Sequence, residues 1–318
     1  MPLHEAMPSE PRITEEPNCL LAPAEEPGPS GSRAGIALAL LTIYLVWGST
    51  YLAMRIALGG LPPFLMAGVR FVIAGVLLLM VLRLRGDPMP TPRQWGGAAL
   101  VGLLLLGGGN GGVVFAEQWV TSGMAALGVA TAPLWAALLA GLWGEWPVRR
   151  EWLGLALGIA GVVLLNLDGG LRASPLGAAA LLLSSVCWAL GTVWSRRLPL
   201  PAGMMASAAQ MLCGGVILLL MSLLHGEHPH GLPTGRPLGA LVYLIFGALA
   251  GFSAYVYLLP RVRPALATSN SYVNPLVAVW LGALLLGERV TPPAVLALLL
   301  ILGGVALTVL AKPSQRGK

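Results

Sequence analysis

The chain has 318 residues, of which 56% are hydrophobic and only 10% are charged, and its mean hydropathy is +0.79. An average soluble domain has about 25% charged residues, so this composition excludes an ordinary soluble protein and indicates a helical membrane protein. The formal net charge of +6 does not indicate nucleic-acid binding, because the basic residues lie in short segments between apolar runs.

The N-terminal segment, residues 1–33, differs from the rest of the chain. It contains six glutamates and several prolines, and it shows no periodic apolar face. A segment of this kind is typical of a disordered tail, and it lacks the basic and apolar regions of a signal peptide. We therefore expect a disordered cytoplasmic tail over residues 1–33.

Ten apolar segments follow this tail, and each is about as long as a membrane-spanning helix. They cover residues 36–56, 62–84, 95–117, 122–144, 151–167, 175–196, 201–224, 237–259, 264–287 and 293–311. Clusters of Pro, Gly, Arg and Glu separate the segments. The sequence therefore predicts an all-α membrane protein with ten transmembrane helices.

Basic residues predict the orientation of these helices. With a cytoplasmic N-terminus, 14 of the 19 basic residues fall on the cytoplasmic side and four fall on the other side. The positive-inside rule then places both termini in the cytoplasm. The remaining basic residue, Arg70, lies inside the second span, where a charge costs roughly 2.5–3.5 kcal/mol at the bilayer centre.

The two halves of the membrane part repeat one another. "PLWAALLAGLWGE" ends at Glu145, and the similar stretch "PLVAVWLGALLLGE" ends at Glu288. The same offset relates Gly48 to Gly191 and Gly161 to Gly304, and a slightly smaller one relates Gly75 to Gly215. A unit of five spans crosses the membrane an odd number of times, so the second copy is inverted, as in many secondary transporters. We expect two inverted five-helix repeats over residues 34–168 and 174–312.

Stretches in both halves resemble the EamA-type members of the drug/metabolite transporter superfamily. They are "VWGSTYLAMRIAL", "LPPFLMAGVRFVIAG", "APLWAALLAGLWGE" and "SYVNPLVAVWLGALLLGE". The resemblance covers about residues 34–311. It implies ten helices in two inverted halves and a central cavity. It also implies export of small metabolites, amino acids or drugs, usually across a bacterial inner membrane.

Polar residues inside the spans are the candidates for a substrate site, because a polar side chain in lipid needs a partner or water. The predicted substrate-binding residues are Trp47, Tyr51, Arg70, Asn110, Trp188, Thr192, Gln210, Tyr255, Asn270 and Asn274. At about 1.5 Å per residue, the polar groups of the two halves approach the midplane from opposite sides. Arg70 corresponds to Gln210 at the offset that relates Gly75 to Gly215, so we expect both to face the bundle interior.

Several of these residues have a structural alternative. Arg70 could bind a carboxylate or phosphate of the substrate, bind backbone carbonyls, or extend to the membrane surface. Asn270 and Asn274 share one helix face and could line a cavity or form hydrogen bonds between helices. Trp47 and Trp188 lie deeper than most interfacial aromatics, which favours a cavity wall over an interface belt.

The acidic and histidine residues give weaker signals. Glu117 is the predicted site of proton coupling, although at the end of its span it could also be solvated. Glu145 and Glu288 lie near Arg149 and Arg289, which favours a structural role such as ion pairing. In one loop, His225, His228, His230 and Glu227 could bind a metal, but the sequence does not support the geometry of a fourth ligand. Neither a metal nor a cofactor is therefore predicted.

Missing motifs exclude several other functions. The chain has no phosphate-binding loop for ATP and no hydrolase motif. The leading hypothesis is a secondary exporter of a small organic solute, driven by a proton gradient or by the gradient of the solute. The alternative is an intramembrane enzyme or a lipid scramblase. The expected partners are the solute and membrane lipids, without nucleic acid, and the sequence does not decide between a monomer and a dimer.

Overall fold

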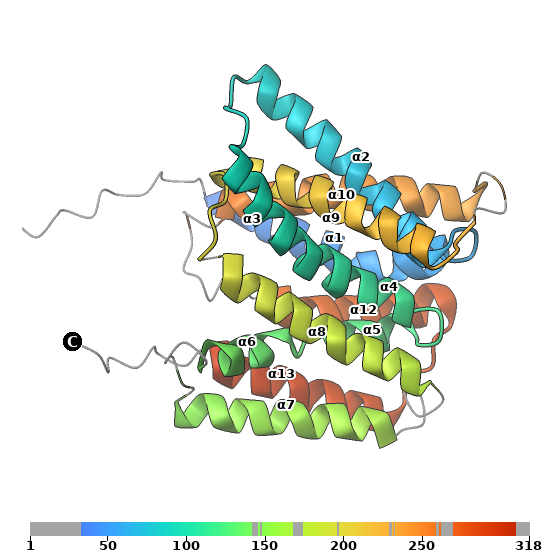
Figure 1. The fold of residues 1–318 in the computed structure, drawn as a ribbon. Helices are drawn as coiled ribbons and strands as arrows, with labels where there is room; N and C mark the ends of the chain where they lie inside the picture. The colour runs from blue at the N-terminus through green and yellow to red at the C-terminus, as the bar shows by residue number, and fades with distance from the viewer. Residues whose placement is uncertain are drawn as a thin grey trace, which may run out of the picture.

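The structure is a computed structural model that describes residues 33–141, 146, 148–167, 174–195, 197–228, 231, 233–258, 261 and 270–309, and in these residues every regular element is a helix. The elements are α1 (Arg33–Ala57), α2 (Pro63–Leu84), α3 (Pro92–Gly102), η1 (Leu103–Asn110), α4 (Gly111–Ala116), α5 (Ser122–Val129), α6 (Ala132–Ala140), α7 (Arg149–Leu167), α8 (Pro175–Ser195), α9 (Gly203–Leu224), α10 (Arg236–Leu258), α12 (Asn270–Leu286) and α13 (Pro292–Val309). Of the predicted tail, only Arg33 lies within the described residues, and it begins α1. The helices form one bundle with α2 on one side and α7 with α13 on the opposite side (Figure 1).

Seven helical segments in the described residues are long and apolar enough to cross a membrane. They are Arg33–Ala57, Pro63–Leu84, Pro92–Ala116, Ser122–Leu139, Pro175–Ser195, Gly203–Leu224 and Arg236–Tyr255. These segments correspond to the first four predicted spans and to the sixth, seventh and eighth. The other predicted spans coincide with α7, α12 and α13, of which the last two contain the shorter apolar stretches Val273–Leu286 and Pro292–Leu307. The count of ten spans therefore stays a prediction.

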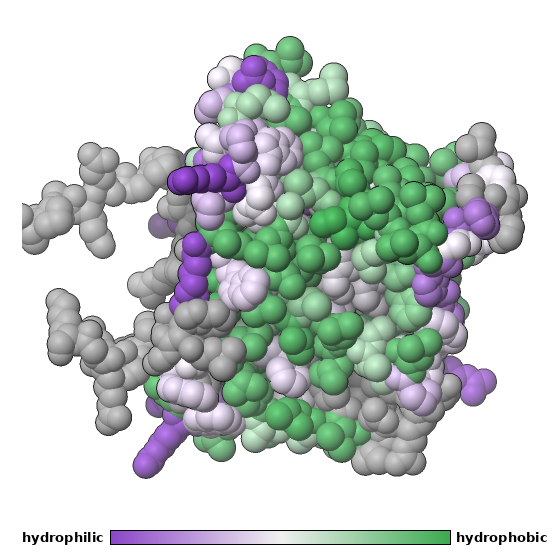
Figure 2. Space-filling view, viewed as in Figure 1, coloured by the Kyte–Doolittle hydropathy of each residue, from purple (hydrophilic) through white to green (hydrophobic). Residues whose placement is uncertain are grey.

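The outer surface of the bundle has the polarity of an integral membrane protein. Hydrophobic side chains cover the middle of the face in Figure 2, and hydrophilic side chains gather at its two ends. Large apolar residues on this surface are well exposed, including Leu77 of α2, Leu220 of α9 and Phe246 of α10. Apolar exposure on this scale is stable in lipid and would favour aggregation in water.

Helices α2 and α9 pack against each other about a local twofold axis. A methyl group added at Gly75 would lie 2.9 Å from the backbone nitrogen of Leu212, and one added at Gly215 would lie 2.8 Å from that of Val72. The offset from Gly75 to Gly215 is also the offset from Val72 to Leu212, so the two contacts are equivalent. The same offset relates the first and last residues of α2 to those of α9. For this helix pair, the packing has the symmetry that an inverted repeat would produce.

Helices α7 and α13 show the same relation at the other side of the bundle. A methyl group at Gly161 would lie 3.2 Å from the backbone nitrogen of Ile301, and one at Gly304 would lie 2.9 Å from that of Gly158. The offset from Gly161 to Gly304 is also the offset from Gly158 to Ile301, so these two contacts are equivalent. Glycine permits such close approach of two helices, because it places no side chain between the backbones.

The predicted third and fourth spans are not regular α-helices. Residues 103–110 form the π-helical segment η1 between α3 and α4. The fourth span is divided into α5 and α6, because Pro133 has no backbone N–H to continue the helix. At this break the Gly128 carbonyl accepts hydrogen bonds from the hydroxyls of Thr131, at 2.7 Å, and Ser185, at 3.0 Å. The same carbonyl accepts a 3.3 Å bond from the backbone N–H of Thr131, so the break leaves no unpaired acceptor there in an apolar environment.

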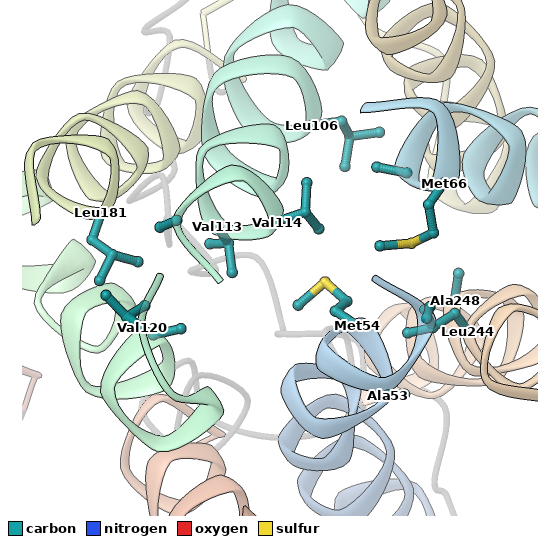
Figure 3. Packing of buried hydrophobic residues seen from close by; sticks show 14 of the residues in the cluster. Ala53, Met54, Met66, Leu106, Val113, Val114, Val120, Leu181, Leu244 and Ala248 are labelled. Atoms are coloured by element: carbon teal, nitrogen blue, oxygen red, sulfur yellow. The ribbon is translucent and has the colours of Figure 1, made fainter. Parts of the chain in front are cut away.

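The main hydrophobic core lies between α1, α2, α4 and α10. The side chains of Met54, Met66 and Val114, all nearly or fully buried, point toward one another in this core (Figure 3). Met54 is adjacent to Arg55, and Met66 lies one helical turn before Arg70. Close packing of the two methionines therefore fixes the backbone that carries both arginines.

Candidate functional site

The bundle has two ends with different turns, and each end is named here after an acidic residue in one of its turns (Figure 1). The Glu227 end contains the α1–α2 turn and the residues that follow α9. The Asp87 end contains the residues that follow α2 and those that precede α9. By the distribution of basic residues, the sequence predicts that the Asp87 end is cytoplasmic.

Glu117 is a buried acid at the Glu227 end. It is the C-cap residue of α4, and its side chain is 0% exposed. Neither carboxylate oxygen has a hydrogen-bond partner among the described residues. Arg55 and Arg70 attract this carboxylate electrostatically, and Glu288 repels it. A buried carboxylate with open hydrogen-bonding capacity is typical of a site that binds a cation or a proton.

Arg70 is the buried cation of the same cluster. It lies on α2 and is 5% exposed, and its Nε and one terminal nitrogen have no hydrogen-bond partner in the described part of the chain. Its guanidinium carbon lies 4.2 Å from the centre of the Phe71 ring. The cation–π contact and the nearby Glu117 offset part of the cost of burial. The guanidinium keeps donors that could bind a carboxylate of a solute.

Residues of α1 complete the cluster. Arg55, in the last turn of α1, donates a hydrogen bond to the backbone carbonyl of Glu117. Tyr51 lies one turn earlier, close enough to interact electrostatically with Glu117. With Glu288, the cluster contains two arginines and two glutamates, so it carries no net charge when all four are ionised. A neutral network is the least costly way to hold several charges in an apolar interior.

Glu288 connects the cluster to the start of α5. Its carboxylate accepts hydrogen bonds from the backbone N–H and the hydroxyl of Ser122, both at 2.9 Å, and from the backbone N–H of Gly123 at 3.3 Å. A carboxylate at a helix N-terminus is stabilised by the unpaired amides and by the helix dipole. These bonds attach Glu288 to α5. The sequence suggested an ion pair with Arg289 instead, and no such pair is found among the described residues.

A cavity of about 800 Å³ opens beside the cluster at the Glu227 end. Its wall includes the α1–α2 turn and the polar side chains of Arg55, Gln118, His225 and Glu227. Arg55 borders this cavity and also contacts Glu117. Arg70 and Glu117 do not line the cavity and are buried behind its wall, so Arg55 is the residue that links the cavity to the buried charges.

Two predicted site residues have the buried, unpartnered character of cavity-lining groups. The side-chain oxygens of Asn110 and Asn274 are buried and have no hydrogen-bond partner among the described residues. Asn110 ends η1, and Asn274 precedes the proline inside α12. Their assignment to the substrate site stays a prediction.

The aromatic members of the predicted site pack between helices. The ring of Trp47 lies 5.5 Å from that of Tyr255 and 5.6 Å from that of Phe252, all at the α1–α10 contact. Trp188 packs on η1, where a methyl group at Gly109 would lie 2.9 Å from the indole ring. These contacts show how the rings are held, and no described contact brings them to Arg70 or Glu117.

The remaining predicted residues have no described contact with the charged cluster. Thr192 is exposed, and its hydroxyl donates to the carbonyl of Trp188 at 2.8 Å. Gln210 is partly buried, with its backbone carbonyl against Gly102 of α3. Asn270 is the partly buried first residue of α12. Of the other sequence candidates, Glu145 and His230 lie outside the described residues.

Sequence reasoning did not assign roles to Arg55 or Glu227. Arg55 was counted only as a basic residue on the non-cytoplasmic side, at the end of the first predicted span, yet it contacts the buried Glu117. Glu227 was weighed only as a metal ligand, yet its two carboxylate oxygens accept hydrogen bonds from the backbone N–H groups of Phe64, at 3.1 Å, and Leu65, at 2.8 Å. A Gly–acid pair after each of two repeat-related helices, at residues 86–87 and 226–227, was the available signal.

Fold and site together define the class of this protein. It is an integral helical membrane protein, with symmetry-related helix pairs and a buried charged cluster next to a cavity.

The chain belongs to the EamA-like transporter family, whose sequence profile matches residues 33–167 and 175–310. It is 47% identical over 276 residues to a protein of Escherichia coli strain K12 named as the inner membrane transporter YedA, covering 86% of this chain and 90% of that protein. It is 24% identical to a protein of Bacillus subtilis strain 168 named as the transporter YoaV, over 85% of this chain and 95% of the other. A solved crystal structure with 24% identity aligns with a TM-score of 0.63, covering 87% of this chain and 98% of the other, which shows a shared fold.

Proposed function

We propose that this chain is a secondary transporter that exports a small organic solute across a bacterial inner membrane by alternating access. The observation that carries the proposal is the pair of oppositely charged, buried side chains, Arg70 and Glu117, both with unused hydrogen-bonding atoms. The membrane arrangement that we propose is ten spans in two inverted five-helix repeats, with cytoplasmic termini. The family membership and the names of the relatives support transport as the function class.

The charge pair suits a solute that carries both an amine and an acid group. Arg70 would bind the acid group, since a guanidinium forms paired hydrogen bonds with a carboxylate. Glu117 would bind the amine in its ionised form. A proton that enters from outside would neutralise Glu117 and release the amine, so proton and solute would compete for one carboxylate. Such competition couples inward proton flow to outward solute flow.

Counterflow in proteoliposomes tests this function. Purified protein is placed in liposomes loaded with a mixture of unlabelled amino acids, and the uptake of each labelled amino acid is measured without any ion gradient. We expect labelled solute to enter by exchange, chemically unchanged, and protein-free liposomes to show no such uptake.

The same liposomes address the alternative functions. A fluorescent phospholipid in the bilayer reports lipid flipping, and chromatography of the recovered solute reports covalent change. Lipid flipping without solute exchange would contradict the proposal in favour of a scramblase. Chemical conversion of the solute would contradict it in favour of an intramembrane enzyme.

A further inference from the structure

Three described helices end in the same kind of turn, which we call a corner: a glycine followed by an acidic residue. The glycines Gly86, Gly226 and Gly287 have positive φ angles of 89°, 69° and 65°. Glycine adopts this conformation without the strain that a side chain would cause, so it ends each helix and reverses the chain. The acids that follow are Asp87, Glu227 and Glu288, and the backbone N–H of each bonds back to the last turns of its own helix at 2.9 to 3.1 Å. The corners after α2 and α9 are related by the same offset as the two helices.

Two of these acids join the two halves of the chain at the Glu227 end. Glu227 belongs to the second half and accepts hydrogen bonds from the first turn of α2, in the first half. Glu288 also belongs to the second half and binds the first turn of α5, in the first half. Each bond pairs a carboxylate with backbone N–H groups at a helix N-terminus, where charge-assisted hydrogen bonds are strong. These bonds must break before the two halves can separate at this end.

Asp87 occupies the repeat-equivalent position at the opposite end. The residues equivalent to Phe64 and Leu65 are Met204 and Met205, in the first turn of α9. The backbone before each helix is alike, with φ and ψ of −61° and 149° at Pro62 and of −76° and 147° at Ala202.

The carboxylate contact with the repeat-related helix is seen at the Glu227 end but, among the described residues, not at the Asp87 end. No hydrogen bond joins the Asp87 carboxylate to the amides of Met204 or Met205, all of which lie in the described part of the chain. At the Asp87 end, the halves are instead joined near α9 by a 3.5 Å hydrogen bond from the Gln94 side chain to the Leu200 carbonyl. The symmetry of the backbone is therefore preserved, while the symmetry of the carboxylate bonds is not.

We propose that Asp87 and Glu227 are alternating latches between the two halves, each holding one end of the molecule closed. In the state seen here, Glu227 holds the first turn of α2. In the opposite state, the Asp87 carboxylate accepts the same pair of hydrogen bonds from the first turn of α9, and Glu227 releases α2. This inference rests on the alternating access of the proposed function and names the side chains that stabilise its two states.

Spin-label distances in lipid nanodiscs, without any solute, test the latches. The full chain carries Ser in place of Cys19, Cys187 and Cys213. One label pair, at Pro62→Cys and His228→Cys, spans the Glu227 end. The repeat-equivalent pair, at Ala202→Cys and Pro88→Cys, spans the Asp87 end. Distance distributions by double electron–electron resonance then report the closed and open populations of each end.

We expect Glu227→Ala to increase the open population at the Glu227 end about tenfold, because two charge-assisted hydrogen bonds are lost from one state only. The pair at the Asp87 end should become shorter. Adding Asp87→Ala in this background should reverse both changes. Glu227→Gln should give a smaller shift of the same sign, and it serves if the alanine variant does not yield folded protein.

A matched control is Glu151→Gln, because Glu151 accepts a 2.7 Å hydrogen bond from the Val148 N–H within its own half. It should move neither distance. Unchanged distances in both Glu227 variants would overturn the proposal, as would an Asp87→Ala substitution that leaves the distances of Glu227→Ala unaltered. Solute exchange is measured separately. Responsive distances without exchange would refute the proposed function alone, and exchange with unresponsive distances would refute the latches alone.

Discussion

At the residue scale, Arg70 and Glu117 are the side chains whose burial most needs an explanation. Each costs free energy in an apolar interior, and each attracts the other in a site that Arg55 connects to the cavity at the Glu227 end. A purely structural ion pair usually uses most of its hydrogen-bonding atoms. Here both carboxylate oxygens and two guanidinium nitrogens remain without partners in the described residues, which favours a binding role.

Replacing Glu117 with Gln tests the coupling role of the acid. The amide keeps the size of the side chain but cannot take up a proton. We expect proton-driven transport in liposomes to fall to the level measured without a pH gradient. Counterflow should persist at saturating solute, with a half-saturation concentration roughly tenfold higher, because one charged contact is lost. Glu151→Gln should retain both activities, and gradient-driven transport by Glu117→Gln would contradict the coupling role.

The sequence identified Arg70 and Glu117 as separate candidates, left Glu117 as buried or solvated, and did not bring the two together. Arg70 was conspicuous as a charge within an apolar run, and Glu117 as an acid at the end of another. Their proximity depends on how α2 and α4 pack, which spacing along one chain does not report. The depths of the polar residues in the membrane were estimated for regular α-helices, which left out the π-helical segment η1. The sequence carried no sign of it, because a run of leucine and glycine is compatible with both kinds of helix.

At the element scale, glycines set the distances between helices. In the α7–α13 contact, Gly304 faces the backbone of Gly154 and Gly158, whereas Gly303 has no atom near the place of a Cβ. These two neighbours therefore differ in whether a methyl group fits. The repeated glycine spacing predicted equivalent positions in the two halves, but it did not show that the equivalent glycines face each other's helices.

Substituting these neighbours tests the packing directly. Gly304→Ala should destabilise the protein by about 1–3 kcal/mol, because the added methyl group forces two backbones apart. Gly303→Ala should have little effect. Thermal unfolding in detergent, followed by the loss of the monodisperse peak, compares the two variants with the unmodified protein. Equal unfolding temperatures for both variants would show that this contact is looser than described.

The interruption of the fourth span illustrates the limit of pattern reading at this scale. Composition predicted one helix over 122–144, whereas the structure has α5 and α6 with a turn before Pro133. The proline was visible, but the sequence did not show that the hydroxyls of Thr131 and of Ser185 in α8 would bond the Gly128 carbonyl at the break. In α12, Pro275 is accommodated within the helix. The same residue type thus has different effects in related segments because its surroundings differ.

At the scale of the whole molecule, the two halves have related backbones and different polar contacts. The α2–α9 and α7–α13 pairs keep the twofold relation. The charged cluster and the Glu227 and Glu288 bonds lie at one end only. Two halves with related backbones and unequal ends are what the proposed alternating access requires. If the two halves exchanged their arrangements, the open end would become the closed end. The nearly constant offset in the sequence predicted the symmetry, and the structure was needed to locate the departures from it.

Solute counterflow with Arg70 variants tests the central claim most directly. In proteoliposomes, the unmodified protein should exchange a labelled solute, and Arg70→Ala should reduce the rate by at least about tenfold, because the loss of hydrogen bonds to a charged group costs about 1.5–3 kcal/mol. Arg70→Ala should still insert and purify as a monodisperse species, and Arg85→Ala, at the exposed end of the same helix, should exchange normally. Full exchange by Arg70→Ala, or its failure to fold, would contradict the assignment of Arg70 to the solute site.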